Sequence, residues 1–169
     1  MSSSAEERIV AVVPALTPEH LALSKLYFVI VTNKRVMGLY CGGLLSGIDR
    51  FASILEALGW TPVAKYSLAK EILLAPSSVP LDKPMIGEEA EVDIEELEKL
   101  LQARKNNFVY SLDEISEVRI EPRRGHDVFY NFTIVAKGKS KKLLVSVRVI
   151  RIVEDLFKKV LKEKLKITY

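Results

Sequence analysis

The segment from Leu26 to Tyr40 constrains the fold of this chain more than any other. It consists of two apolar runs that are joined by a short polar turn, Thr32 to Arg35. Both runs are rich in β-branched and aromatic residues, which favour strands. Asn33 tolerates the left-handed backbone conformation that a two-residue hairpin turn requires. The segment therefore predicts a β-hairpin whose tip is formed by Asn33 and Lys34.

A two-residue period marks further strands on both sides of this hairpin. Residues 9–13 are apolar at every position, which suits a strand buried on both faces. Residues 108–111 form a short strand, and Val118 and Ile120 alternate with charged neighbours in the next. Residues 128–136 and 143–148 continue this pattern. The second half of the chain is therefore predicted to be an antiparallel meander.

The stretch between about residues 43 and 106 has a helical period instead. Apolar residues recur at steps of three and four up to Gly59, and a second short helix is expected over 67–75. Asp93 followed by Glu96 resembles a capping box, which predicts a third helix over 94–105. A terminal amphipathic helix over 150–166 places its apolar residues on one side, namely Val153, Leu156 and Val160.

The order of these elements resembles the pleckstrin-homology-like superfamily, including its prokaryotic PH and GRAM-like members. The resemblance rests on the hairpin with its T-N-K-R turn, the phrase Y-S-L-D-E-I-S-E-V at Tyr110 to Val118, and the terminal helix. It implies an α+β fold: a seven-stranded antiparallel bent barrel capped by a C-terminal helix. The chain would be a single domain, 1–169, with a helical insertion at about 43–106 between strands three and four.

Composition limits the classes of protein that fit this chain. Cys41 is the one cysteine among 169 residues, so no internal disulfide can form, and a reducing compartment, the cytoplasm, is expected. The formal charge of +3 is too small to indicate a nucleic-acid or membrane surface by itself. No apolar run approaches the ~20 residues of a spanning helix. Abundant Lys, Glu and Arg beside one Gln is typical of proteins from hot environments.

Basic residues near two predicted turns are the first candidates for binding. A tentative anion site would use Arg119, Arg123, Arg124 and His126, because arginine offers paired donors to phosphate or carboxylate. Lysines 137, 139, 141 and 142 crowd the following turn. The alternative is that both turns are ordinary solvated surface. The loop before the hairpin, residues 14–25, carries only His20 and Lys25, so the basic loop of inositol-phosphate binders is missing.

Apolar residues of the predicted insertion form a second candidate surface. They exceed what two helices can bury against each other, so they must cover the sheet, a pocket or another subunit. This tentative partner surface consists of Leu45, Ile48, Phe51, Leu55 and Trp60. The sequence leaves open whether the surface is an internal cover, a lid or the interface of a homo-oligomer.

Catalysis has little support in the sequence. His20 and His126 lie far apart and show no metal-ligand spacing, so no metal, cofactor or catalytic residue is expected. Nothing near Cys41 in sequence would activate its thiol. The glycines at 42 and 43 lack the Gly-Lys-Ser/Thr ending of a phosphate loop.

These observations predict a non-catalytic binding or assembly module, with a protein or peptide partner favoured. The alternative is binding of an anion, a phospholipid headgroup or nucleic acid through the basic turns, with peripheral membrane contact left open. Nucleic acid is less favoured, because the acidic run at 88–98 would repel phosphate. An enzyme is the least favoured class.

Overall fold

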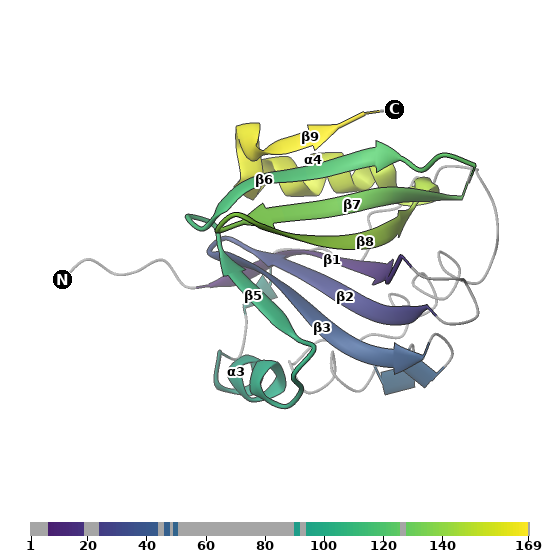
Figure 1. Cartoon of the computed structure of the whole chain (residues 1–169). Coiled ribbons are helices and arrows are strands. Elements are labelled where there is room, and N and C mark those ends of the chain that lie inside the picture. Colours follow the sequence, from purple (N-terminus) through teal and green to yellow (C-terminus); the bar gives the residue numbers. More distant parts are fainter. Residues whose placement is uncertain are drawn as a thin grey trace.

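The structure of the protein, a computed structural model, describes residues 7–18, 24–43, 46–47, 49–50, 90–91, 94–125 and 128–168. Strands from both halves of the chain join in one sheet (Figure 1). The strands are β1 (Arg8–Leu16), β2 (Lys25–Thr32), β3 (Arg35–Gly43), β4 (Ala90–Glu91), β5 (Phe108–Ser111), β6 (Ile115–Pro122), β7 (Phe129–Ala136), β8 (Lys139–Ser146) and β9 (Leu165–Ile167). The helices are α3 (Ile94–Gln102) and α4 (Ile150–Leu161), and the 3-10 turns η2 (Val147–Val149) and η3 (Lys162–Lys164) flank α4.

The sheet consists of two meanders that meet at one short junction. Its order is β5-β3-β2-β1-β8-β7-β6-β9, and β4 pairs separately with β1. The junction between β1 and β8 has only two paired positions, Ala15 with Val145 and Leu16 with Leu144. In Figure 1, α4 lies at the top of the molecule with β6 and β9, and α3 lies below β5. Helix α4 also packs against β1 and β2 of the first meander.

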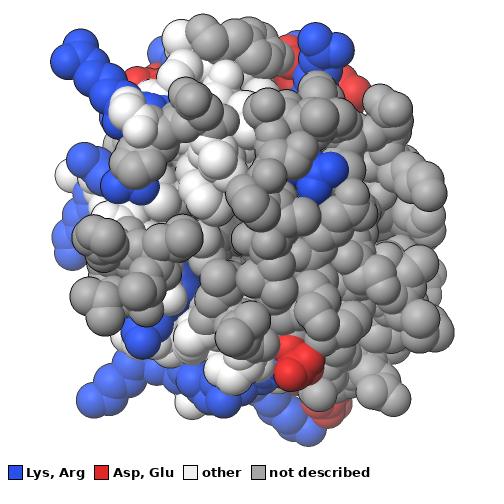
Figure 2. Space-filling model, turned by 90° about the vertical axis from the view of Figure 1, so that its right-hand side faces the viewer, with Lys and Arg blue, Asp and Glu red and all other residues white. Residues whose placement is uncertain are grey.

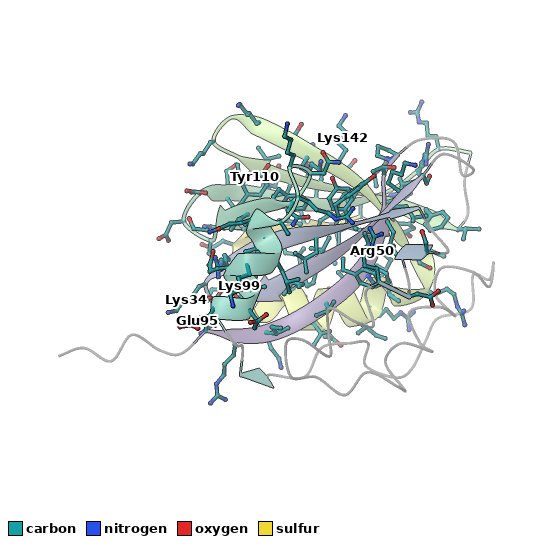
Figure 3. The ribbon with its side chains drawn as sticks, turned by 90° about the horizontal axis from the view of Figure 1, so that it is seen from below. Lys34, Arg50, Glu95, Lys99, Tyr110 and Lys142 are labelled. Atoms are coloured by element: carbon teal, nitrogen blue, oxygen red, sulfur yellow. The ribbon has the colours of Figure 1, made fainter. Side chains whose placement is uncertain are left out.

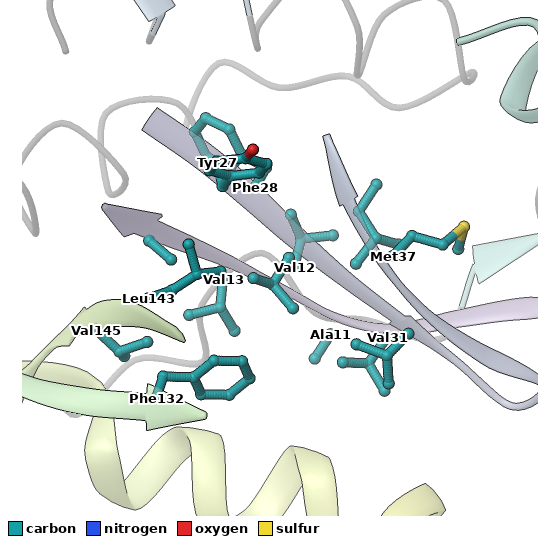
Figure 4. Close-up of a cluster of buried hydrophobic side chains, with 14 of the residues drawn as sticks. Ala11, Val12, Val13, Tyr27, Phe28, Val31, Met37, Phe132, Leu143 and Val145 are labelled. Atoms are coloured by element: carbon teal, nitrogen blue, oxygen red, sulfur yellow. The ribbon is translucent and has the colours of Figure 1, made fainter. Parts of the chain in front are cut away.

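Strands β1 and β2 are buried on both faces. Every residue of β1 after Arg8 is buried, and so is every residue of β2 after Lys25. This confirms the expectation for residues 9–13, because a strand without polar alternation has no face to offer to water. Figure 4 shows part of the resulting core, in which residues of β1, β2 and β3 lie near Phe132, Leu143 and Val145.

The predicted hairpin is confirmed, but its turn works differently from the prediction. Outside glycine, only Lys137 and Lys162 have positive φ among the described residues, so Asn33 does not adopt the left-handed conformation. Instead, Thr32 Oγ1 accepts hydrogen bonds from the backbone N–H groups of Lys34 and Arg35. Asn33 Oδ1 accepts from the N–H of Arg8, which ties the turn to the start of β1.

The terminal helix forms and is shorter than the prediction. Val153, Leu156, Phe157 and Leu161 are buried, and the Phe157 ring meets Phe132 edge to face at 6.1 Å. The helix ends at Leu161, because Lys162 has a φ of 51°. The chain then turns back as β9, whose Leu165 and Ile167 pair in parallel with β6.

The predicted fold class, a seven-stranded antiparallel PH-like bent barrel with a helical insertion between strands three and four, is wrong. Among the described residues the sheet has nine strands, and the pairing of β9 with β6 is parallel, so the sheet is mixed. After β3, the described residues 46–47 and 49–50 are helical, β4 then pairs with Arg8 and Ile9, and α3 follows it. The third predicted helix is confirmed as α3. The rest of the helices expected before residue 76 lies outside the described residues.

A buried ion pair fixes α3 and the β2–β3 turn to the start of the chain. Arg35 Nε donates to Glu7 Oε1 at 2.7 Å, and a second guanidinium nitrogen pairs with Glu98 of α3 at 2.6 Å. Thr32 Oγ1 also donates to Glu7 at 2.8 Å. Burial lowers the pKa of Arg35, but its hydrogen bonds to Glu7 and Glu98 outweigh burial and raise it overall. Three separate segments of the chain therefore meet at Arg35.

We expect Arg35→Met to lower the free energy of unfolding by about 3 kcal/mol, because it leaves the buried Glu7 carboxylate without its cation. Adding Glu7→Met should restore most of the loss, since a buried ion pair is replaceable by apolar side chains of similar volume. Urea denaturation of the single and double variants measures both effects. If Arg35→Met and the Arg35→Met/Glu7→Met double variant lose the same free energy of unfolding, the ion pair does not have this role.

Candidate binding site

Four aromatic residues from three adjacent strands line one face of the sheet. Tyr27 of β2 is paired directly with Tyr40 of β3, and their ring centroids are 5.3 Å apart. Phe108 of β5 lies 5.8 Å from Tyr27, and Tyr110 lies 5.5 Å from Phe108. The rings form a continuous row because directly opposed residues of paired strands point to the same face. Figure 3 labels Tyr110 beside helix α3.

Gly38 makes room for this row. It is paired directly with Phe108, and a Cβ atom at Gly38 would lie 2.0 Å from the Phe108 ring. The ring therefore rests on the bare backbone of β3, which is a common reason for glycine within a strand. Any larger residue at position 38 would displace the central ring of the row.

The C-terminal end of α3 holds the row in place through two asparagines. Asn107 Oδ1 accepts from the backbone N–H of Tyr40 at 2.7 Å, and its Nδ2 donates to the carbonyl of Leu100 at 2.8 Å. The Tyr27 hydroxyl donates to the carbonyl of Asn106 at 2.9 Å. The end of the helix and the aromatic row are thus joined by hydrogen bonds, and both are attached to the sheet.

Two cations lie against these rings. Lys141 Nζ, which comes from β8, is 5.0 Å from the Tyr27 centroid and 5.5 Å from that of Phe108. The Arg104 guanidinium carbon is 5.9 Å from the Tyr40 centroid. Each contact is worth about 0.5–1 kcal/mol where water has access. We call Tyr27, Tyr40, Phe108, Tyr110, Lys141 and Arg104 the aromatic–cation cluster.

The cluster is partly open to solvent. Tyr27 is 3% exposed, and burial and the neighbouring Tyr40 raise the pKa of its hydroxyl, so it stays protonated near neutral pH. Tyr40, Phe108, Tyr110 and Lys141 are half-buried, and Arg104 is exposed. Val109, which is 39% exposed, lies between Phe108 and Tyr110 in sequence and points to the opposite face of β5. The arrangement can offer apolar contact area and positive charge to a ligand at the same place.

The tentative anion site and the following lysines do not form one patch. Arg119 pairs with Glu117 at 3.2 Å and Glu121 at 3.7 Å on its own strand. Arg123 and Arg124 follow β6, whereas Lys137 lies at the other end of β7 and pairs with Glu114. The eight residues of β7 separate these turns by roughly 25 Å. His126 lies outside the described residues. Figure 2 shows Lys and Arg side chains mostly, but not only, toward the margins of one face.

The tentative partner surface of the insertion lies outside the part of the chain that the structure describes. This applies to Leu45, Ile48, Phe51, Leu55 and Trp60. Its role as a cover, a lid or an interface therefore stays a prediction.

Cys41 has the properties of a core residue. Its side chain is fully buried, and burial raises the pKa of the thiol to about 12 despite the nearby Arg50 and Arg104. Such a thiol is almost entirely protonated at neutral pH and is a poor nucleophile. Among the described residues, no group of three His, Cys, Asp or Glu side chains is placed to hold a metal ion. No helix within the same residues is long and apolar enough to cross a bilayer.

Comparison with known proteins gives little similarity. No model of a known protein family matches the chain, and no curated protein is similar to it in sequence. Among solved structures, the chain is similar to the hSac2 domain from human phosphoinositide phosphatase Sac2, with 9% identity and a TM-score of 0.45. That alignment covers 97% of this chain and 77% of the other. Similarity at this level carries no functional inference.

The predicted membership of the pleckstrin-homology-like superfamily is therefore wrong. No family model supports it, and a structural similarity with a TM-score of 0.45 cannot replace such support. The T-N-K-R turn and the phrase at Tyr110 to Val118 describe a local hairpin and a strand start, which many sheets share.

Sequence reasoning missed the aromatic–cation cluster. Phe108 and Tyr110 alternate around Val109 and indicate a common face of a strand, and Gly38 interrupts an otherwise bulky strand. These two signals together would have suggested an aromatic ring resting on a glycine. The pairing of β5 with β3, and the approach of Lys141 from β8, have no local signature.

We expect Gly38→Ala to displace the Phe108 ring and to destabilise the fold by about 1–3 kcal/mol, the usual cost of overpacking. The ring-current shifts that Phe108 imposes on Tyr27 and Tyr110 should change in the NMR spectrum. Adding Phe108→Ala should relieve the clash and recover part of the stability. If Gly38→Ala has wild-type stability and an unchanged aromatic spectrum, the described contact is incorrect.

Proposed function

We propose that this chain is a non-catalytic binding module for a protein or peptide partner, and that the contact is made at the aromatic–cation cluster. The single buried thiol suits a reducing compartment, and we propose the cytoplasm as its location. The proposal is supported mainly by one observation: half-buried Tyr40, Phe108 and Tyr110 lie together with Arg104 on one face.

The composition of the cluster supports a protein partner. Tyr and Arg are enriched among the residues that dominate the binding energy of protein interfaces, and these residues gather in well-packed patches. Aromatic side chains offer large contact areas and lose few rotamers on binding. A partner that covers this patch would remove apolar area from water and would meet two cations.

The rigidity of the cluster supports binding as well. Its aromatic members stand on strands whose neighbours form the core, and Asn107 fixes the backbone of Tyr40. When the side chains and backbone of a site are already fixed in the free protein, binding costs little additional conformational entropy. A catalytic role has no comparable support, since the thiol of Cys41 is buried and its pKa is raised.

A second copy of this chain is one partner that the proposal allows. The apolar residues predicted for the insertion would favour a homo-oligomer, and this stays a prediction about residues outside the described part. Light scattering over a range of concentrations measures the oligomeric state directly. If wild type and Tyr110→Ala have equal masses in solution, the cluster does not form the contact between two copies. Its partner would then be a different molecule.

Selection of a random peptide library on the immobilised protein should enrich a set of related peptides. We expect Tyr110→Ala to weaken their binding about tenfold or more, because interface aromatics of this kind commonly contribute at least 1–2 kcal/mol. Tyr130→Ala is the matched control, since Tyr130 is a half-buried aromatic of β7 that lies outside the cluster. Fluorescence anisotropy of the labelled peptides gives the dissociation constants.

Two outcomes would contradict the proposal. The first is that no peptide is enriched over a surface without protein. The second is that the enriched peptides lose affinity equally in Tyr110→Ala and Tyr130→Ala, which would place the contact elsewhere.

A further inference from the structure

Lys141 differs from the other lysines of its strand. It is half-buried, whereas Lys139 and Lys142 are exposed, and its ammonium group lies over the Tyr27 and Phe108 rings. No carboxylate of the described residues is recorded within ion-pair distance of it, so the two rings are the partners that the structure shows for this cation. Lys142, the next residue, is exposed and points to the opposite face of the strand. Lys142 is labelled in Figure 3.

A cation in this position is incompletely compensated. Its ammonium group faces two rings, and a ring face attracts a cation more weakly than a carboxylate does. A carboxylate or phosphate next to Lys141 would form a charge-assisted hydrogen bond in a partly dry environment, where such bonds are strongest. Arg104, at the Tyr40 end of the row, provides a second donor without a carboxylate partner among the described residues. The cluster is therefore electrostatically complementary to an acidic ligand.

The tilt of the rings distinguishes an acidic peptide from a nucleic acid. Neighbouring rings of the row are inclined to one another by 66°, 41° and 33°. Successive nucleic-acid bases stack on ring faces that are open and nearly parallel to the bases. Tyr27 is buried, and Lys141 lies over its ring, so that platform is missing. Side chains of a peptide have no such requirement and can pack against tilted rings.

We propose that the aromatic–cation cluster binds an acidic peptide segment. A carboxylate of Asp or Glu pairs with Lys141, and an adjacent aromatic or apolar side chain packs on Phe108 and Tyr110. A second carboxylate, farther along the segment, reaches Arg104. This inference rests on the proposed function and adds to it the chemical class of the partner.

The test uses the full chain and a labelled random copolymer of Glu and Tyr as the probe. We expect saturable binding that weakens as salt is raised, because the contact includes ion pairs. Lys141→Gln should weaken binding about tenfold to a hundredfold, which is the usual range for a lost charge-assisted hydrogen bond. Lys142→Gln is the matched control and should bind like wild type. Lys141→Arg keeps the charge and should retain most of the affinity.

NMR spectra of the labelled protein locate the contact independently of the variants. Shifts on addition of the copolymer should concentrate on Tyr40, Phe108, Tyr110 and Lys141. Thermal unfolding of Lys141→Gln should stay a single cooperative transition, lowered only by the few degrees that two lost cation–π contacts imply (about 2–4 °C per kcal/mol), which separates loss of binding from loss of fold.

Four results would overturn the inference. Equal losses in Lys141→Gln and Lys142→Gln would indicate a non-specific charge effect. Equally tight binding of a Lys and Tyr copolymer would show that acidity is irrelevant. Tighter binding of a thymidine oligonucleotide or of inorganic phosphate at the same residues would assign the site to phosphate. If library peptides bind through Tyr110 but are neither acidic nor sensitive to Lys141→Gln, the proposed function stands and this inference falls.

Discussion

The apolar character of both faces of β1 and β2 governs the rest of the structure. β1 and β2 are buried along almost their whole length, so this part of the sheet requires cover on both sides. Helix α4 and the second meander supply part of that cover, with Phe157 and Phe132 in edge-to-face contact. Leu97 and Leu101 of α3 belong to the same core. The ion pairs of Arg35 with Glu7 and Glu98 then set where α3 lies relative to the hairpin.

The aromatic–cation cluster is a consequence of this arrangement. β1 and β8 pair through Ala15 and Leu16, which joins the two meanders. Lys141 lies four residues before Val145 of that junction, and its side chain reaches the rings of Tyr27 and Phe108 in the other meander. Tyr40, Phe108 and Tyr110 remain half-buried. The candidate surface is therefore built from residues of both meanders and is held by their strands.

Local patterns predicted the elements better than their arrangement. The hairpin, α3 and the terminal helix are signalled by alternation, capping residues and an apolar stripe, all of which act between near neighbours in sequence. The pairing of β4 with Arg8 and of β9 with Val118 depends on contacts distant in sequence, and neither short strand has a pattern of its own. The fold class was wrong for this reason.

The arginines at 119, 123 and 124 were predicted to bind an anion because they lie close together in sequence. In the structure, Arg119 is paired with Glu117 and Glu121. Lys141 appeared as one lysine among several, because its position over Tyr27 arises only in three dimensions.

The most direct test of this account is the NMR environment of the Lys141 side chain in the free protein. If the ammonium group lies over Tyr27 and Phe108, the ε-methylene protons should be shifted upfield by ring currents and should show nuclear Overhauser effects to both rings. The same protons of Lys142 should have ordinary shifts. Identical, unshifted signals for Lys141 and Lys142, without contacts to either ring, would contradict the account.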